Sequence, residues 1–420
     1  MTQQVALLCS EPIRAAMGGI GIRYLEFARH LPRPGLNVVL ISPGEPSQAS
    51  GLPSSVDVRQ LRRGNMKSLL QDCSCVVAQG HRADELVSAA PELPAAIDLY
   101  DPFLVEHFQY FGTLGPNVYR HDHASWVLQM SHGDYFLCSS EEQKFYYLGF
   151  LTAIGRVCPE AVEQDETLDR LIAAVPCGVN PDLPAHRPFL APRGPGEKRL
   201  LFGGLYDWYD PWTVLQALEK LNRPDCVLIL MRNPNLETTP QRKMEEVTAW
   251  CAERRWLDGR VKIMDWVPAD RRYDLLRDVD ALVAPHRDTF ETRLSFRTRF
   301  LDALAAGCPV LTSEGGTLSR LIREQKAGLV VAPQDAEGLA RALADLLDGR
   351  CDVASMRSNG VKLIREYAWD KVVEPLARFC MNPYVDSAKT RPAPPQTTVA
   401  PAAAPGVGRL KRMVRRFTSA

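Results

Sequence analysis

Short apolar runs alternate with longer amphipathic segments along most of the chain. In the first half the apolar runs cover residues 5–9, 38–41, 75–78, 96–99 and 135–138. Each is followed by a more polar or helical segment, beginning with a glycine loop and the helical stretch 22–31. Buried strands that alternate with helices are typical of a parallel sheet. The pattern therefore predicts one α/β domain that ends near residue 180.

A proline-rich stretch separates this domain from a second series of the same kind. Residues 181–198 contain five prolines and two glycines, which indicates an interdomain linker. The apolar runs of the second series cover residues 199–203, 226–230, 261–264, 281–284, 309–312 and 328–331. Two such halves predict a cleft between them, because ligands of open parallel sheets bind beyond the carboxyl ends of the strands. We place the two domains at residues 1–182 and 183–365.

The end of the chain has a different composition. Residues 384–408 are rich in Pro, Ala and Thr without apolar periodicity, which predicts a disordered or extended tether. In residues 409–420, apolar side chains recur at helical spacing between basic ones. This pattern predicts a short basic amphipathic helix suited to an anionic membrane surface or a partner groove. The alternative is a charged tail without helical structure.

Composition excludes several classes of protein. Of the 420 residues, 45% are hydrophobic and 24% charged, and the formal net charge is zero, so nothing favours a nucleic-acid partner. We expect no signal peptide, since Glu11 stands where apolar residues would be needed, and no apolar run is long enough to cross a bilayer. Eleven cysteines without CxxC spacing predict reduced thiols in a cytoplasmic protein. Cys73 and Cys75 are spaced poorly for a metal site.

A glycine-rich loop follows the first strand. Gly18, Gly19 and Gly21 precede a helix, where a backbone without side chains approaches a phosphate or sugar closely and the helix N-terminus favours negative charge. The spacing is not the dinucleotide GxGxxG, so a nicotinamide cofactor is not indicated. A plain tight turn is the alternative.

Carboxylates follow the run at residues 96–99. Asp98 and Asp101 stand at this strand end, trailed by Glu106 and His107. We expect Asp98 to project into the cleft, where it can bind acceptor hydroxyls or take a proton from one. For Asp101 we favour a helix cap before Pro102.

Residues 284–310 are the most informative stretch. A strand ends at Pro285, a polar loop follows, and we expect a helix from near Ser295 to Gly307. The loop and the helix start carry His286, Glu291, Arg293, Arg297, Thr298 and Arg299. Such a helix start is a natural pyrophosphate site, and Asp302 further along can accept hydrogen bonds from ribose hydroxyls. The alternative is a solvated helix whose arginines pair with Glu291 and Asp302.

Three further strand ends carry glycine or charge. Gly203 and Gly204 open an aromatic stretch to Pro211 that can form a lip over a ligand and stack on a base or sugar ring. Arg232 follows the next strand and can reach a phosphate or the base. Gly315 and Gly316 offer further backbone N–H groups.

These motifs resemble the family 4 type of retaining glycosyltransferases over roughly residues 5 to 382. Residues 300–312 are similar to the family's helix and strand around its second acidic residue, with Asp302 in place of Glu. Gly315 and Gly316 resemble its glycine pair, and Trp369 its closing segment. A bacterial subgroup is more similar still, with runs like residues 203–211, 233–234, 266–268 and 291–299 of this chain. In the first half, residues 97–102 and 138–143 with Leu148-Gly149 are similar to that subgroup too.

The chain departs from the family pattern in two places. The E-x7-E spacing is absent, because Leu294 stands eight positions before Asp302 and Glu291 eleven before it. The Arg…Lys pair that clamps the donor pyrophosphate is replaced by Gly204 and the Tyr209–Asp210 pair. Arg297, Arg299 or Arg232 are the candidates to supply the missing charge.

The resemblance implies a GT-B fold: two Rossmann-like domains face each other across a cleft, and a helix at residues 366–383 crosses back to the first domain. It implies transfer of a sugar from a nucleotide-sugar donor to a glycan, lipid-linked or cell-envelope acceptor, with retention and without a metal. We assign Glu291, Asp98 and His286 as catalytic residues. The donor would contact Asp302, Arg297, Arg299, Thr298, Gly203, Gly204, Arg232, Gly315 and Gly316. Gly18 and Gly19 complete the predicted binding set, and the acceptor would lie near residues 18–21 and Asp98.

Other functions remain open at this point. A sugar-nucleotide epimerase or a phosphorylase would share the fold, and a degenerate scaffold would lack the clamp residues. We expect the domains to close around both substrates, a hypothesis that rests on the proline-rich hinge. The basic segment 409–420 would place the protein peripherally at the inner face of a membrane.

Overall fold

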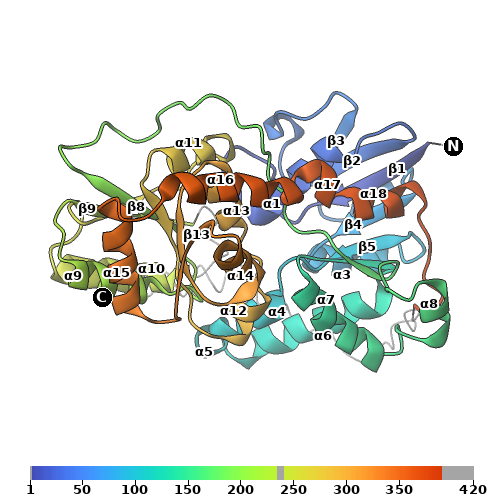
Figure 1. Cartoon of the computed structure of the whole chain (residues 1–420). Coiled ribbons are helices and arrows are strands. Elements are labelled where there is room, and N and C mark those ends of the chain that lie inside the picture. Colours follow the sequence, from blue (N-terminus) through green and yellow to red (C-terminus); the bar gives the residue numbers. More distant parts are fainter. Residues whose placement is uncertain (1, 234–240, 390–420) are drawn as a thin grey trace, which may run out of the picture. The chain divides into compact units, whose positions relative to one another are not determined.

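A computed structural model describes residues 2–233 and 241–389, and it contains two parallel sheets (Figure 1). In the first, the strand order is β3-β2-β1-β4-β5-β6-β7. The strands are β1 Gln3–Leu8, β2 Leu36–Ser42, β3 Val56–Gln60, β4 Cys75–Ala78, β5 Ala95–Asp98, β6 Tyr135–Cys138 and β7 Ile172–Ala174. The order reverses between β1 and β4, the point where doubly wound sheets bind ligands.

The second sheet repeats this plan with the order β10-β9-β8-β11-β12-β13. Its strands are β8 Lys198–Gly204, β9 Cys226–Met231, β10 Val261–Met264, β11 Ala281–Val283, β12 Val310–Ser313 and β13 Gly328–Val331. Neighbouring strands are parallel throughout both sheets. Here the order reverses between β8 and β11, so loops that leave these two strands are expected at a ligand site.

Helices follow most strands. In the first domain they are α1 Gly19–His30, α2 Met66–Leu69, α3 His81–Ala89, α4 Phe103–Glu106, α5 Phe111–Leu114, α6 Pro116–His132, α7 Glu141–Ala153 and α8 Pro159–Gln164. In the second they are α9 Pro211–Leu221, α10 Arg242–Glu253, α11 Arg272–Arg277, α12 Phe290–Leu294, α13 Thr298–Ala305, α14 Gly316–Glu324, α15 Ala336–Leu347 and α16 Val353–Ile364. Four short 3-10 helices are η1 Pro46–Gln48, η2 His107–Tyr110, η3 Ala269–Arg271 and η4 Arg365–Tyr367.

Burial on both faces explains why the strands read as continuous apolar runs. In β1, Val5 and Leu7 belong to one core cluster, while Ala6 and Leu8 belong to another on the opposite face. Successive side chains of a strand point to opposite faces, so a sheet covered by helices on both sides needs apolar residues at every position. The second sheet is built in the same way, with two further core clusters.

The chain returns to the first domain at its end. After α16 the helices α17 Trp369–Val372 and α18 Glu374–Met381 pack beside α1 and β1 in the first core (Figure 1). Trp369 packs edge-on against Phe27, at 6.0 Å between ring centroids. The predicted fold class, two parallel α/β domains with a final crossing helix, is confirmed.

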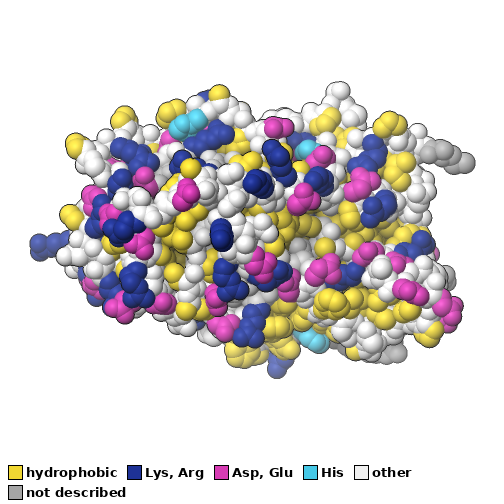
Figure 2. All heavy atoms as spheres, in the orientation of Figure 1, with side chains coloured by type: hydrophobic (Ala, Val, Ile, Leu, Met, Phe, Trp, Pro, Cys, Tyr) yellow, Lys and Arg dark blue, Asp and Glu magenta, His cyan; other side chains and the backbone are white. Residues whose placement is uncertain are grey.

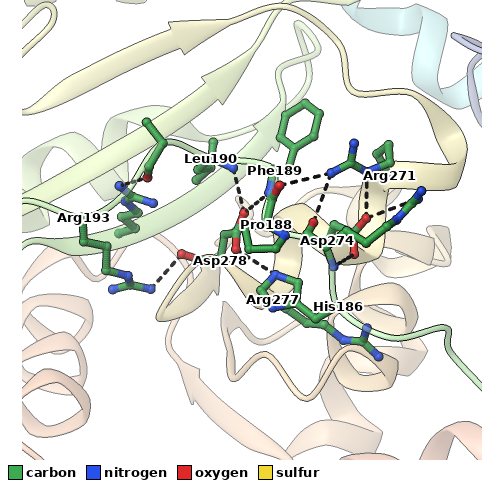
Figure 3. Close-up of polar contacts among 12 residues, drawn as sticks. His186, Pro188, Phe189, Leu190, Arg193, Arg271, Asp274, Arg277 and Asp278 are labelled. Atoms are coloured by element: carbon green, nitrogen blue, oxygen red, sulfur yellow. Dashed lines mark hydrogen bonds and ion pairs between the residues drawn. The ribbon is translucent and has the colours of Figure 1, made fainter.

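The proline-rich linker is fixed to the second domain (Figure 3). Asp278 accepts hydrogen bonds from the backbone N–H groups of Phe189 and Leu190, and Asp274 accepts one from that of Arg187. Arg193 bonds Asp280, and Arg271 donates to two linker carbonyls. Residues 186–193 are therefore held by α11 and the residues that follow it, so the expectation that this linker is the hinge needs correction.

The predicted tether also begins later than expected. Residues 384–389 lie against the first domain, where Asp386 pairs with the buried Arg156 and Lys389 with Asp134. Tyr384 covers the guanidinium of Arg170, at 4.0 Å from its carbon to the ring centroid. The remaining tether and the predicted helix at 409–420 lie outside the described residues.

Three local predictions differ from the structure. The strands β3 and β7 were not predicted. The helix expected from Ser295 begins at Thr298 as α13, and the loop expected before it contains a further short helix, α12. Asp101 is no cap, because the position before α4 is Pro102 and Asp101 instead accepts a hydrogen bond from Gln79 Nε2 at 2.9 Å.

Side chains of both charges are interspersed over the face that Figure 2 shows. This distribution agrees with the zero net charge of the sequence. Among the described helices, none has the length and apolar character that a membrane span requires.

Candidate active site

Glu291 of α12 and Arg297, the residue before α13, form a buried ion pair in the candidate site. The distance from Arg297 Nη2 to Glu291 Oε2 is 2.7 Å, and both side chains are almost completely buried. Ser295 donates a hydrogen bond to the other carboxylate oxygen. Thr289 caps α12 and so fixes the helix that carries Glu291. Glu291 is therefore held rigidly, with Arg297 as its counter-ion.

His286 lies beside this pair with a neutral ring. Its side chain is buried, with 1% of the residue exposed, and neither ring nitrogen has a hydrogen-bond partner among the described residues. Burial, with the positive charges of Arg297 and Arg299, holds the pKa of His286 well below its usual range. Its backbone is fixed because its N–H donates to Ser313 Oγ at 2.7 Å. A buried imidazole without a partner points to a polar ligand, because such groups are normally satisfied.

Arg299 brings a positive charge to the end of β8. Its guanidinium donates to the carbonyls of Phe202 at 2.9 Å and Gly204 at 3.2 Å, and it covers the ring of Tyr209 at 4.3 Å. No carboxylate of the described residues forms an ion pair with it. The charge of Arg299 is therefore not neutralised, unlike that of Arg297.

Two glycine pairs belong to the predicted donor site, and the first of them lies beside Arg299. A Cβ on Gly204 would lie 2.3 Å from Trp266, and Gly203 has a positive φ of 88° and lies close to Arg299. Gly315 and Gly316 have φ of 124° and 75° at the start of α14, which only glycine adopts without strain. A side chain would therefore clash at Gly204, Gly315 and Gly316, whereas at Gly203 it is the positive φ that disfavours one. Thr298 is the first residue of α13, and Arg232 is exposed after β9.

Asp302 keeps partial access to solvent. One turn into α13, its Oδ1 lies 3.2 Å from Arg272 Nε, and 25% of the side chain is exposed. It is therefore better placed for contact with a ligand than the buried Glu291. Of the alternative, the pairing of Glu291 with an arginine of this stretch is correct, whereas Asp302 pairs with Arg272 of α11. The helix is not a solvated surface helix, since Phe300, Leu301 and Leu304 are buried.

The glycine loop of the first domain is occupied by the chain itself. Glu11 Oε2 accepts hydrogen bonds from the backbone N–H groups of Gly18 and Gly21, each at 3.1 Å. A carboxylate is stabilised at the N-terminus of a helix for the same reason as a phosphate. The backbone N–H groups of Gly18 and Gly21 thus bind a carboxylate of the chain itself, and ligand binding by Gly18 and Gly19 stays a prediction.

Asp98 is not directed into the space between the domains. Arg23 binds both of its oxygens, at 2.7 and 2.8 Å, and neither side chain is exposed. Arg23 also donates to the Val175 carbonyl and lies over the rings of Phe27 and Tyr100. Since a strand end was expected to present this carboxylate to substrate, the expected placement is wrong, and the geometry favours a structural role.

A pair of carboxyl groups near α4 has raised pKa values. Burial raises the pKa of Asp101 to about 6, helped by the negative charge of Asp98, while Gln79 opposes the rise. Burial and the charges of Asp101 and Glu291 raise the pKa of Glu106 well above its usual range. Sequence reasoning noted Glu106 without assigning it a role. The proximity of α4 to α12, which brings it near Glu291, is not visible in the sequence.

The two domains meet through residues that the sequence did not single out. Gln143 donates to the Leu294 carbonyl at 2.9 Å, and Thr317 donates to Glu142 at 2.6 Å. The ring of Tyr110 lies 6.0 Å from that of Trp208 in the aromatic stretch after β8. Residues 138–143 resemble the bacterial subgroup of the family, but their sequence does not reveal that they contact the second domain. No cluster of possible metal ligands is found among the described residues.

Comparison with known proteins now adds to this geometry. Residues 197–349 match the family described as Glycosyl transferases group 1. The second domain is thus similar to group 1 glycosyltransferases over most of its length. The match covers the glycines after β8, the Glu291–Arg297 pair, Arg299 and Asp302, so the candidate site lies largely within it.

Curated relatives include mannosyltransferases. The chain is 27% identical over 230 residues to a phosphatidyl-myo-inositol mannosyltransferase of Mycobacterium leprae, which covers 54% of this chain and 58% of that protein. It is 29% identical to a lipopolysaccharide core biosynthesis mannosyltransferase of Rhizobium meliloti over 33% of this chain and 37% of that protein. The matched region thus spans little more than half of the first of these relatives.

Solved structures share the fold over most of the chain. HepE of Anabaena in complex with UDP-glucose has a TM-score of 0.64 at 14% identity, covering 89% of this chain and 98% of that one. Sucrose-phosphate synthase of Thermosynechococcus elongatus has a TM-score of 0.62 at 15% identity, covering 90% and 98%. WaaG, a glycosyltransferase of lipopolysaccharide biosynthesis, has a TM-score of 0.57 at 17% identity, covering 90% and 100%. These matches confirm the GT-B fold.

Proposed function

We propose that the protein transfers a sugar from a nucleotide-sugar donor to a glycan, lipid-linked or cell-envelope acceptor. One observation carries this proposal. At the strand ends where the second sheet reverses its order, the unneutralised Arg299 lies beside Gly203 and Gly204, and the unpartnered His286 is buried within electrostatic reach of Arg299. This arrangement suits a diphosphate and a polyhydroxyl ligand, and it lies in a domain that matches glycosyltransferases.

The donor lies on the second domain in this proposal. Arg299 takes the place of the clamp residues that are missing after β8 and binds the diphosphate, while Thr298 and Arg297 stand at the start of α13. The exposed part of Asp302 binds the ribose hydroxyls. Gly203, Gly204, Gly315 and Gly316 let the backbone approach the ligand, and Arg232 lies at the next strand end.

Catalysis is then mainly electrostatic. As the bond between the sugar and the diphosphate breaks, Arg299 and backbone N–H groups offset the negative charge that develops on the leaving group. The neutral His286 and the Glu291–Arg297 pair face the sugar, and the chemistry of these residues requires no metal. By the family 4 resemblance the reaction retains the anomeric configuration. The mannosyltransferase relatives support a cell-envelope acceptor.

We further propose that the protein works in the cytoplasm at the inner face of a membrane. Its eleven cysteines are free thiols, which suits a reducing compartment. The basic segment at 409–420 would provide the membrane contact. Vesicles with anionic lipids should sediment the full chain but not a 1–389 truncation, and equal sedimentation of both proteins would contradict this contact.

A thermal-shift screen tests the donor proposal. UDP, GDP, TDP and ADP sugars are compared on the wild type, Asp302→Ala and Arg299→Ala, because a ligand that binds the native state raises the melting temperature. We expect one nucleotide to stabilise the wild type and neither variant. Arg293→Ala is the matched control, since Arg293 is exposed and paired with Asp288 on the same segment. If no nucleotide sugar stabilises the wild type, the donor proposal is contradicted and a scaffold role is favoured.

A further inference from the structure

A histidine and an aspartate on the first domain form a close pair outside the groups assigned so far. His107, the first residue of η2, has its Nδ1 at 2.8 Å from Oδ2 of Asp122 on α6. The Asp122 side chain is 4% exposed, whereas that of His107 is 33% exposed. A buried carboxylate thus holds an imidazole that remains partly exposed.

The pair fixes the tautomer of the ring. Since a carboxylate accepts hydrogen bonds, Nδ1 of His107 carries the hydrogen, and Nε2 of the neutral ring is left with its lone pair. The rings of Tyr110 and Phe103 lie beside the imidazole, at 5.3 and 6.1 Å between centroids. The ring is therefore held in one orientation by contacts on more than one side.

The position of this pair connects it with the donor site. Tyr110, at the other end of η2, contacts Trp208 of the stretch after β8. The helix α4, which directly precedes η2, packs against α12, the helix that carries Glu291. The negative charge of Asp101 is also within electrostatic reach of His107. His107 thus lies on the first domain close to where that domain meets the candidate donor site.

We propose that His107 Nε2 accepts the proton of the acceptor hydroxyl and that Asp122 is the residue that positions it. This inference rests on the proposed function and adds to it the residue that takes the proton from the acceptor. As the acceptor oxygen bonds to the anomeric carbon on the face from which the diphosphate leaves, its proton passes to Nε2 and the configuration is retained. The bond from that carbon to the diphosphate oxygen breaks, and its electron pair leaves with the nucleoside diphosphate. The proton on the imidazolium returns to solvent after product release.

The other acidic groups nearby are less suited to this step. Both oxygens of Asp98 are bound by Arg23, and Glu291 is bound by Arg297 and Ser295. The raised pKa of Glu106 favours its protonated form, which accepts no proton. Asp101 already accepts from Gln79. His107 combines a ring nitrogen held by Asp122 with a side chain that is partly exposed.

The kinetic test compares His107→Ala and Asp122→Asn with His123→Ala. His123 is an exposed histidine on the same helix as Asp122 and serves as the matched control. General base catalysis contributes about 10²–10⁴-fold, so we expect kcat of His107→Ala to fall by at least about 100-fold. The nucleotide-dependent thermal shift should stay unchanged. Added imidazole should restore part of the His107→Ala rate, which a purely structural role would not allow. Transfer by His107→Ala within threefold of wild type would overturn the proposal.

A second measurement does not depend on activity. In full-length protein labelled with ¹⁵N-histidine, with the signal assigned through the His107→Gln variant, long-range ¹H–¹⁵N spectra report which ring nitrogen carries the hydrogen. We expect Nδ1–H in the neutral ring of wild type, and a ring with Nε2–H would overturn the proposal. If the wild type binds donors but transfers sugar to no acceptor, the proposed function is contradicted. The tautomer of His107 still tests the proposal that its Nε2 is the proton acceptor.

Discussion

Asp386 Oδ2 lies 2.5 Å from Arg156 Nη2, and this ion pair joins the end of the described chain to the interior of the first domain. Arg156 also donates to the carbonyls of Met130 and Gly133, so its guanidinium is bound from several sides. A guanidinium that is completely buried needs its counter-ion, because an unpaired buried charge is strongly destabilising.

Truncation should therefore be sensitive to a few residues. A chain that ends at 389 keeps this pair, whereas one that ends at 384 removes Asp386 and Lys389 together. We expect the 1–384 chain and Asp386→Ala to lose about 1–3 kcal/mol of unfolding free energy, measured by urea denaturation, and the 1–389 chain to match the full chain. If the 1–384 chain is as stable as the 1–389 chain, the ion pair of Asp386 with Arg156 contributes nothing to the unfolding free energy.

Removal of Arg299 should weaken nucleotide binding selectively. A hydrogen bond to a charged group is worth about 1.5–3 kcal/mol, which corresponds to a roughly 10- to 100-fold higher Kd for the nucleoside diphosphate in Arg299→Ala. Calorimetric titration at two salt concentrations would measure it. The exposed Arg293→Ala should bind within twofold of wild type, and an equal loss in both variants would show that the effect is only long-range charge.

Glu291 should matter for stability as well as for activity. Glu291→Ala leaves Arg297 buried without its counter-ion, which costs about 3–5 kcal/mol by analogy with other buried pairs. Thermal denaturation should therefore show a lower Tm. Glu291→Ala combined with Arg297→Met should regain part of the loss, because no unpaired charge remains. A double variant less stable than Glu291→Ala would contradict this explanation.

The fold could be predicted where strands are buried on both faces. The strands β4 and β6 were predicted with the bounds that the structure gives, since every residue of a doubly covered strand tends to be apolar. The strand β3 was not, because its half-exposed sequence Val56-Asp-Val-Arg-Gln60 is interrupted by charge at the sheet edge. The strand β7 has only three residues, too few to give a pattern.

The site was predictable as a set of strand ends, but its pairings were not. The glycines and arginines after β8 and β11 were identified from their places along the chain. The partners of Asp98 and Gly18 were not, since Arg23 is 75 residues from Asp98 and Glu11 reaches Gly18 through a turn of the loop. Such contacts follow from how the loops fold over the sheet. His107 was noted after a strand end, whereas its partner Asp122 lies on a different helix.

Stability should depend on pH through Asp101. Its pKa is raised to about 6 in the folded protein, mainly by burial, from about 3.8 as an ordinary carboxyl. The folded state thus binds more protons than the unfolded state between about pH 4 and 6, so this group lowers stability as pH rises through that window. We expect Asp101→Asn to be more stable than wild type above pH 6 and the difference to shrink toward pH 4. Urea denaturation across this range would show it, and a difference that does not change with pH would contradict it.

We expect any hinge between the domains to lie in the two crossing segments, which are the stretches around Val179 and Tyr367. The backbone N–H of Val179 donates to the Tyr367 carbonyl at 2.8 Å, and these two segments are where the chain passes between the domains. A Cβ on Gly178 would lie 2.6 Å from Trp369, so Gly178→Ala forces two closely packed segments apart and should cost about 1–3 kcal/mol. Gly149→Ala, at a helical position with open space, is the matched control.

If the domains close on the donor, small-angle scattering of wild type should show a smaller radius of gyration with saturating nucleotide sugar. Gly178→Ala should show less compaction than Gly149→Ala. Asp278→Ala, which releases the linker but leaves the crossing segments intact, should compact like wild type. Loss of compaction in Asp278→Ala alone would instead return the hinge to the proline-rich linker.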